Sequence, residues 1–291
     1  MNKTNAPYVI LNGKVVPSEE ASVPVDDRGF LYGESVFTTL RCYGGVPFRL
    51  VRHCARLNAS LRSPVVGIEY EVEPAILEAG IRRLVELNNC PEAVARFAIT
   101  RGRGAGPSPP ANVTPTTILA VRPSVPRASL YTRGASLFVS SVRRDPEGQL
   151  GRHKLGSYFP CLLATRQAAE RGCDEAVICD TNGNFLECAC SNLFAAVDGA
   201  LVTPDVTENI LPGIARETAL ECAADIGLNV SLEKLTPRVV KNAKEWFITS
   251  SLLEVVPVAR LGETEYPVPG PVTRQLMRAF REVVSRETAA R

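Results

Sequence analysis

The sequence predicts an α+β protein of two domains, a small one followed by a larger, mostly β domain with flanking helices. Segments with strand-like patterns are interleaved with segments whose apolar residues recur at helical spacing. The stretch from Arg122 to Ser129 then breaks the pattern, because two prolines in four residues exclude a helix or a central strand there. We therefore expect a small domain over residues 1–122, a linker over 123–134 and a large domain over 135–291.

Turn residues and periodicity define the elements of the first domain. Asn12-Gly13 between apolar segments is the strongest short-range signal of a hairpin. Gly44-Gly45 marks another turn between two strand-like segments. Helical spacing of apolar residues appears twice, once on each side of residue 70. The expected elements are a hairpin over 8–16, strands over 35–43 and 46–50, helices over 50–61 and 73–87, and strands over 94–101 and 116–121.

The second domain is expected to contain more strands than helices. Its strand candidates are short apolar runs, and a helix is expected to begin at Gly213. The expected elements are strands over 136–141, 175–179, 192–196 and 245–250, and helices over 159–171 and 213–226.

Composition excludes several classes of protein. The chain has 291 residues, 45% of them apolar and 22% charged, which is ordinary for a soluble globular protein. The net charge of +2 comes without a basic block, so we expect neither a nucleic-acid nor a membrane partner. The first residues lack the apolar core of a signal peptide, and no later run approaches the length of a membrane span.

The cysteines and histidines narrow the choice further. Nine cysteines, mostly set singly in apolar segments, indicate reduced thiols in a cytoplasmic protein. No metal site is expected, because Cys188 and Cys190 lack further ligands nearby, and His53 and His153 are the only histidines. The glycines over 102–106 match neither nucleotide-binding fingerprint.

Three features together indicate a site for pyridoxal 5′-phosphate. Lys154 can form an imine with the aldehyde of this cofactor. Glu187 follows a predicted buried strand and can keep the pyridine nitrogen protonated. Gly213 opens a helix, whose first backbone N–H groups can receive the phosphate.

The chain resembles the fold-type IV pyridoxal-phosphate enzymes, which include branched-chain and D-amino acid aminotransferases and aminodeoxychorismate lyase. The resemblance covers nearly the whole length, from the segment 27–37 to the segment 249–258, and several motifs agree in order and spacing. It implies the two-domain fold of that group, pyridoxal 5′-phosphate as cofactor, and amino acids and 2-oxo acids as substrates. It also implies a homodimer, because a neighbouring subunit closes each substrate pocket in that group.

The resemblance assigns catalytic roles to individual residues. Lys154 is expected to form the imine and then to move the proton between the substrate Cα and the cofactor C4′. Glu187 pairs with the pyridine nitrogen, and Tyr158 donates toward the phenolic oxygen of the cofactor. Lys154 and Tyr158 are four residues apart, whereas typical branched-chain enzymes have five, which weakens that subtype.

The resemblance also assigns the phosphate contacts. Arg56 matches the arginine that pairs with the phosphate in relatives. Most relatives have threonine where Ala215 stands, so this chain lacks one hydroxyl there, and Arg216 is expected to be structural. The remaining expected contacts come from the start of one helix and from a second loop, at Gly213, Ile214, Ala215, Ser250 and Ser251.

The segment after Arg101 is where the sequence departs from its relatives. D-amino acid aminotransferases and the lyases carry a carboxylate-binding arginine at a position that corresponds here to the region of Gly106. Arg103 is the nearest arginine, and we expect it to bind the substrate carboxylate, although another group could hold it. Phe37 is the second expected substrate residue, and Arg101 is expected to be structural.

Three functions remain open from the sequence. The first is an aminotransferase that uses a Lys154 imine. The second is aminodeoxychorismate lyase, which releases pyruvate and 4-aminobenzoate; Phe37-Thr38-Thr39 and Glu187-Cys188 resemble lyase sequences, with the Thr38 hydroxyl as a candidate for proton transfer. The third is a relative that binds the cofactor without turnover. The amino donor and its chirality are undetermined at this stage.

Overall fold

The computed structural model describes residues 6–125 and 127–289, which divide into two compact units. The first unit contains the chain up to Val125 together with His153–Tyr158 and the end from Glu287; the second contains the rest. The division after Val125 falls inside the predicted linker, but α4 (Ala128–Arg133) occupies the second half of that linker. The segment with Lys154 belongs to the first unit, a grouping that the sequence did not predict.

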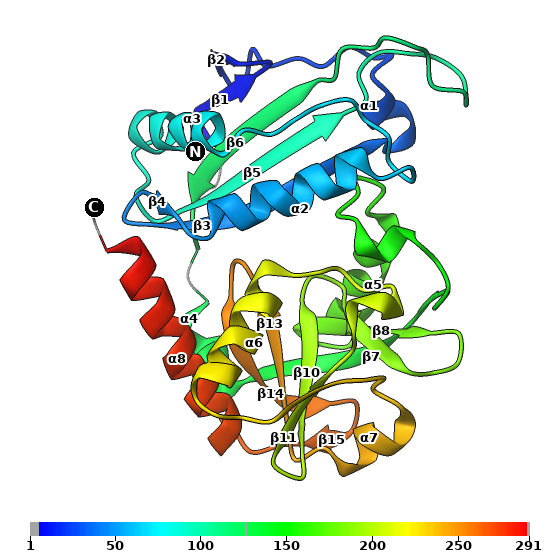
Figure 1. The fold of residues 1–291 in the computed structure, drawn as a ribbon, viewed down its shortest axis with the longest axis vertical. Coiled ribbons are helices and arrows are strands. Elements are labelled where there is room, and N and C mark those ends of the chain that lie inside the picture. Colours follow the sequence, from blue (N-terminus) through cyan, green and yellow to red (C-terminus); the bar gives the residue numbers. More distant parts are fainter. Residues whose placement is uncertain (1–5, 126, 290–291) are drawn as a thin grey trace. The chain divides into compact units, whose positions relative to one another are not determined.

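The first unit is built on a six-stranded antiparallel sheet (Figure 1). Its strand order is β2-β1-β6-β5-β3-β4. A short helix, α1 (Arg28–Tyr32), precedes β3; the Asp27 side chain accepts from the N–H of Gly29 at its start, and Gly33 ends it in the left-handed region. The strands are β1 (Tyr8–Leu11), β2 (Lys14–Pro17), β3 (Ser35–Tyr43), β4 (Val46–Pro47), β5 (Ala93–Thr100) and β6 (Thr117–Pro123).

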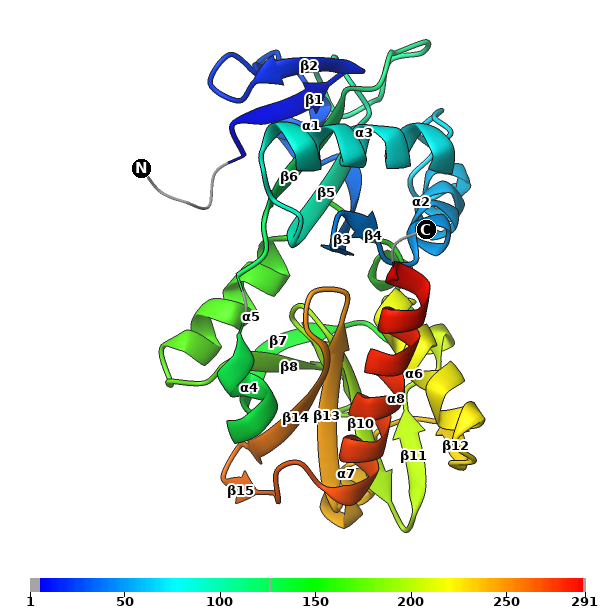
Figure 2. The ribbon, with the colours of Figure 1, turned by 90° about the vertical axis from the view of Figure 1, so that its left-hand side faces the viewer.

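Two helices, α2 (Leu50–Arg62) and α3 (Pro74–Leu87), pack on one face of this sheet (Figure 2). Val36 and Leu40 of β3 point into the core that the helices complete with Leu57 and Ile81. Because side chains alternate along a strand, Phe37 and Thr39 lie on the opposite face of β3. That second face carries the candidate substrate and lysine residues described below.

The second unit contains a nine-stranded mixed sheet. Its main path is β12-β11-β10-β13-β14-β7-β8-β9, and β15 pairs with β14. β7 runs parallel to both β8 and β14. The strands are β7 (Ala135–Arg144), β8 (Glu175–Asp180), β9 (Phe185–Cys188), β10 (Asn192–Val197), β11 (Ala200–Thr203), β12 (Val230–Leu232), β13 (Glu245–Ser250), β14 (Glu254–Leu261) and β15 (Thr264–Glu265).

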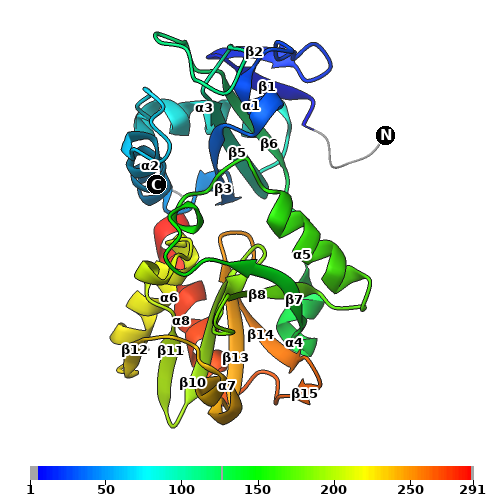
Figure 3. The ribbon, with the colours of Figure 1, turned by 90° about the vertical axis from the view of Figure 1, so that its right-hand side faces the viewer.

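Helices flank this sheet. α5 (Phe159–Ala169) packs against β7 and β8 (Figure 3), and α6 (Ile214–Asp225) packs against β13 and β14. α7 (Pro237–Asn242) is a short helix before β13, and α8 (Pro271–Thr288) is the last element. The first turn of α8 is capped by Glu245, whose carboxylate accepts from the N–H of Thr273 at 2.9 Å.

The predicted fold class is confirmed, and the four predicted helices and most strands appear within a few residues of their expected bounds. The segment expected as a strand over 46–50 is a strand only at Val46–Pro47, because α2 begins at Leu50. The sequence analysis missed α8, although Leu276, Phe280 and Val283 have helical spacing after Pro271 at the first helical position. Among the described residues, no helix is long and apolar enough to cross a membrane.

Candidate active site

Lys154 is held by strand-like pairing with β3. The N–H of Phe37 donates to the carbonyl of Lys154 at 2.9 Å, and the N–H of Gly156 donates to the carbonyl of Ser35 at 2.7 Å. A Cβ on Gly156 would lie 1.9 Å from the Ser35 hydroxyl, so only glycine permits this approach. Leu155 packs on the core, and the alternation along the segment therefore turns Lys154 toward the face of Phe37.

The Phe37 ring is the centre of the group around Lys154. Lys154 Nζ lies 4.9 Å from its centroid, and the Tyr158 ring meets it edge-on at 5.7 Å. The guanidinium carbon of Arg96 stands 3.6 Å from the same centroid. Three residues predicted for the site (Phe37, Lys154 and Tyr158) are thus brought together in the first unit.

Arg96 is a residue that the sequence analysis missed. It lies on β5, paired with Thr39 of β3, and its guanidinium shares the ring of Phe37 with Lys154. Partial desolvation lowers the pKa of Arg96, although a good part of its side chain stays exposed. The available signal was an arginine within a strand of otherwise apolar residues, Ala93 to Ile99.

Thr38 lies on the opposite face of β3 from Phe37. Its side chain is buried, and its hydroxyl lies 2.7 Å from His53 Nδ1 on α2. Arg56 Nη2, one helical turn further on, donates to the same hydroxyl at 3.2 Å. The expected catalytic hydroxyl therefore faces α2, whereas the expected substrate residue Phe37 faces Lys154. Strand alternation is the physical reason, because adjacent residues cannot share a face.

Glu187, in the second unit, is a buried carboxylate surrounded by donors. Arg144 Nη1 donates to its Oε1 at 2.6 Å, and the side-chain amide of Asn192 and the N–H of Leu211 donate to its Oε2 at 3.1 Å each. Only 8% of the Glu187 side chain is exposed, so the ion pair with Arg144 stabilises its charge in a place of low solvation.

A second carboxylate, Glu175, holds the connection between β9 and β10. It accepts from the N–H of Cys190 at 2.6 Å and from the Ser191 hydroxyl at 2.8 Å. Burial is the main cause that raises the pKa of Glu175. Neither Glu175 nor Arg144 was identified from the sequence, because a contact partner distant in the chain leaves no local pattern.

Asn192 connects Glu187 with the start of α6. Its amide nitrogen also donates to the carbonyl of Leu211 at 2.9 Å. Its Oδ1 lies 1.9 Å from where a Cβ on Gly213 would stand, so this close contact requires glycine at the N-cap. Asn192 therefore positions both the carboxylate and the turn that begins the helix.

The residues predicted for phosphate binding in the second unit offer several donors. Gly213 caps α6 without a side-chain cap within the described chain, which leaves the first N–H groups at Ile214 and Ala215 for a ligand. Thr249 Oγ1, at the end of β13, is buried and has no hydrogen-bond partner among the described residues. This buried hydroxyl, next to Ser250 and Ser251 in the sequence, could donate a hydrogen bond to a phosphate oxygen. Arg216 donates to the carbonyl of Pro204 at 2.8 Å.

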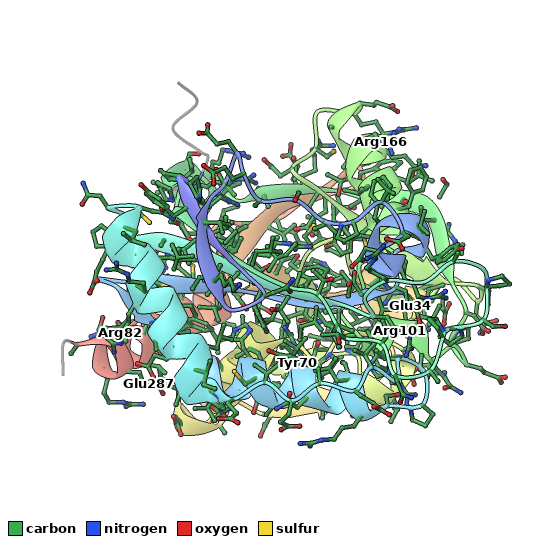
Figure 4. All side chains as sticks on the ribbon, turned by 90° about the horizontal axis from the view of Figure 1, so that it is seen from above. Glu34, Tyr70, Arg82, Arg101, Arg166 and Glu287 are labelled. Carbon is green, nitrogen blue, oxygen red and sulfur yellow. The ribbon has the colours of Figure 1, made fainter. Side chains whose placement is uncertain are left out.

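The two arginines after β5 are held by other partners. Arg103 is largely exposed, and its Nε donates to both carboxylate oxygens of Asp26, at 2.9 and 3.1 Å. Arg101 forms an ion pair with Glu34, which lies beside it in Figure 4, and donates to the carbonyls of Val66 and Gly67. These contacts give Arg101 a structural role, and a substrate would have to compete with Asp26 for Arg103.

The nine cysteines all lie in the described chain, and none forms a disulfide. Cys188 is buried and Cys190 is exposed, so the two do not share one environment. Burial raises the pKa of the Cys188 thiol well above its ordinary range, as expected for a packing residue. Among the described residues, no cluster of three or more histidines, cysteines or acids could hold a metal ion.

Comparisons with known proteins agree over almost the whole chain. The family described as Amino-transferase class IV matches residues 35–261. The structure of Escherichia coli branched-chain amino acid aminotransferase is similar with a TM-score of 0.87 and 32% identity, covering 97% of this chain and 96% of that one. The D-alanine aminotransferase of Bacillus licheniformis is 29% identical over 97% of this chain and 98% of its own length. A Legionella pneumophila protein provisionally named 4-amino-4-deoxychorismate lyase has a TM-score of 0.84 and 25% identity, covering 91% and 96%.

Proposed function

Since the chain belongs to the class IV aminotransferase family, we propose that this aminotransferase works with pyridoxal 5′-phosphate, attached through Lys154. Its substrates would be amino acids with apolar side chains and 2-oxo acids. The observation that carries the proposal is the position of Lys154 Nζ beside the rings of Phe37 and Tyr158, with the guanidinium of Arg96 on the same ring. A branched-chain enzyme and a D-alanine enzyme are both among the similar proteins, so the chirality of the amino donor has to be measured with D- and L-amino acids.

Lys154, Tyr158 and Glu187 have different roles in the proposed reaction. When bound, pyridoxal 5′-phosphate supplies an aldehyde that accepts the amino group and a protonated ring that withdraws electrons. Lys154 Nζ would take the proton from the substrate α-carbon as a general base and deliver it, as a general acid, to the cofactor carbon that carried the aldehyde oxygen. Tyr158 would donate a hydrogen bond to the phenolic oxygen of the cofactor. The carboxylate of Glu187, held by Arg144 and Asn192, would accept a charge-assisted hydrogen bond from the protonated nitrogen of the cofactor ring.

We assign the cofactor phosphate to three groups of donors. Arg56 supplies a guanidinium from α2. The start of α6, at Gly213, Ile214 and Ala215, supplies backbone N–H groups and a favourable helix dipole. Ser250, Ser251 and the unpaired hydroxyl of Thr249 supply further donors, which compensates for the hydroxyl that Ala215 lacks.

Two arginines compete for the role of substrate carboxylate ligand. Arg103 was expected from the sequence, but Asp26 pairs with it and most of its side chain is exposed. The guanidinium carbon of Arg96 lies 3.6 Å and Lys154 Nζ lies 4.9 Å from the centroid of the Phe37 ring, so both belong to the group of side chains around that ring. We therefore favour Arg96 for the carboxylate, and Phe37 for contact with the apolar part of the substrate.

The lyase remains the second candidate, because a protein provisionally named as one is similar in structure. The sequence argument for the lyase included a threonine hydroxyl near the reacting carbon. Thr38 contacts His53 and Arg56 on the other face of β3, and this removes that argument.

A homodimer in the cytoplasm is part of the proposal. Apolar side chains are exposed in runs on two helices, at Phe30, Leu31 and Tyr32 of α1 and at Phe159, Leu162 and Leu163 of α5. Such runs favour a protein interface over solvent. Nine cysteines without a disulfide in the described chain agree with a reducing compartment.

Two measurements test the function. The purified protein should be yellow, and Lys154→Ala should lose both the visible band of the lysine-bound cofactor and nearly all turnover, while the exposed control Lys241→Ala keeps them. An unchanged spectrum in Lys154→Ala would overturn the cofactor assignment.

The second measurement is the half-reaction with a panel of D- and L-amino acids. An aminotransferase converts bound aldehyde to pyridoxamine phosphate in one stoichiometric step, with the fastest rates expected for branched apolar donors. Release of pyruvate from aminodeoxychorismate, with the aldehyde regenerated, would instead establish the lyase.

A further inference from the structure

Thr38, His53 and Arg56 form a buried group on the helix-covered face of the first sheet. The Thr38 hydroxyl lies 2.7 Å from His53 Nδ1 and accepts from Arg56 Nη2 at 3.2 Å. Thr38 and His53 are each only 1% exposed, so water does not satisfy these groups. The role of this group is not explained by the mechanism above, which uses only Arg56.

The chemistry of the three side chains determines the direction of each hydrogen bond. A guanidinium has donors and no acceptor, so Thr38 Oγ1 must accept from Arg56. The hydroxyl hydrogen then needs an acceptor, and His53 Nδ1 is the one within reach in the described structure. The buried imidazole of His53 is neutral, because burial first and the charges of Arg56 and Lys154 second lower its pKa well below the ordinary range. A neutral imidazole offers one acceptor nitrogen, which is Nδ1 here.

We propose that Thr38 and His53 are positioning residues that fix the guanidinium of Arg56 for the cofactor phosphate, and that Thr38 takes no part in proton transfer at the reacting carbon. The inference rests on the proposed function, since it assigns the phosphate to Arg56. The hydroxyl of Thr38 uses its donor and its acceptor, because it accepts a hydrogen bond from Arg56 and donates one to His53. A side chain with both of its bonds used on the α2 face has no proton to offer on the face of Phe37 and Lys154.

The test separates phosphate binding from ring binding. Apoenzyme is prepared for the wild type, Thr38→Val and Thr38→Ser, and the dissociation constants of pyridoxal 5′-phosphate and of pyridoxal, which lacks the phosphate, are measured. Thr38→Val should weaken binding of the phosphorylated cofactor by about 10-fold and leave the affinity for pyridoxal unchanged. Thr38→Ser should restore the wild-type ratio of the two constants.

Two further variants act as controls. Thr39→Val removes a hydroxyl from the neighbouring position on the other face of β3, and it should leave the ratio of the two constants unchanged. In an Arg56→Gln background, Thr38→Val should add no further loss of phosphate-dependent affinity, because its effect passes through Arg56.

Four results would overturn the inference. An equal loss of affinity for both ligands would show a general packing effect. Unchanged affinities with a slower proton-transfer step would return Thr38 to a catalytic role. Additive losses in the double variant would show that Thr38 and Arg56 act separately. A wild-type protein that binds neither ligand would refute the proposed function itself, and this inference with it.

Discussion

At the scale of single residues, the neutral state of His53 has a consequence for stability. Its folded-state pKa is lowered, by burial first and then by Arg56 and Lys154. In the unfolded chain the imidazole titrates near its ordinary pKa of 6.5. Below pH 6.5 the imidazole binds a proton in the unfolded state but not in the folded state. The contribution of His53 to the free energy of unfolding is therefore constant above pH 6.5 and decreases as the pH falls below 6.5.

We therefore expect acid to destabilise the wild type by about 1.4 kcal/mol per pH unit from this residue alone, between pH 6.5 and the lowered folded pKa. The urea midpoint should be measured at pH 7.5, 6.5 and 5.5, at one fixed cofactor concentration. His53→Gln should be less stable at neutral pH but lose less stability toward pH 5.5. The control is His153→Gln, since His153 contacts Ser60 and Ser63 and is not fully buried. Parallel slopes in wild type and His53→Gln would contradict the assignment.

Arg96 and Arg103 give the second prediction at this scale. A charge-assisted bond to a carboxylate contributes about 1.5–3 kcal/mol, which corresponds to roughly 10- to 150-fold in the Michaelis constant. Arg96→Ala should raise the constant for the best amino donor by this amount. Arg103→Ala should change it by no more than about 2-fold, because the residue forms an exposed ion pair with Asp26. The opposite pattern would restore Arg103 as the carboxylate ligand.

At the scale of elements, the start of α6 depends on one close contact. Gly213 has an ordinary φ of −73°, so its backbone does not require glycine. The requirement comes from Asn192, whose Oδ1 occupies the place of a Cβ. Asn192 cannot withdraw without losing its bonds to Glu187 and to the carbonyl of Leu211.

Gly213→Ala should therefore destabilise the protein by about 1–3 kcal/mol and weaken cofactor binding, because it displaces Asn192. Thermal unfolding and cofactor titration measure the two effects. In an Asn192→Ala background, where the side chain no longer fills the space, Gly213→Ala should cost much less. An equal loss of stability in both backgrounds would show that Gly213 is not required because of its contact with Asn192.

The helices of this protein differ in how well they could be predicted. α2 and α3 have apolar faces that pack on one sheet, so periodicity and turn residues located them within a residue or two. α1 has five residues and is stabilised by Asp27 and Gly33 at its ends, which periodicity cannot detect. α8 had a readable pattern that the sequence analysis left unused.

At the scale of the whole molecule, the exposed apolar residues of α1 and α5 predict a dimer interface. Phe30 of α1 is 74% exposed, and Phe159 of α5 is 65% exposed. We expect light scattering to give the mass of two chains, and Phe30→Glu to shift the protein toward the monomer with loss of activity. Ile76→Glu is the matched control, since Ile76 is 69% exposed on α3 but lies outside these runs. A fully active monomeric wild type would refute the dimer.

The sequence alone indicated the family, the α+β class, most strands and four of the eight α-helices of the described residues, and it is the basis for proposing Lys154, Glu187 and Gly213 as site residues. These depend on neighbours in the chain, through periodicity, turn residues and motif spacing. It could also have shown that Phe37 and Thr38 face opposite ways, since alternation is a local property of a strand. Only the tertiary structure decided that Arg96 lies on the Phe37 ring, that Asp26 pairs with Arg103, and that Arg144 and Asn192 hold Glu187. All of these contacts except the bond from Asn192 to Glu187 join segments far apart in sequence, and a charge or hydrogen bond forms with whichever group the packed fold places next to it.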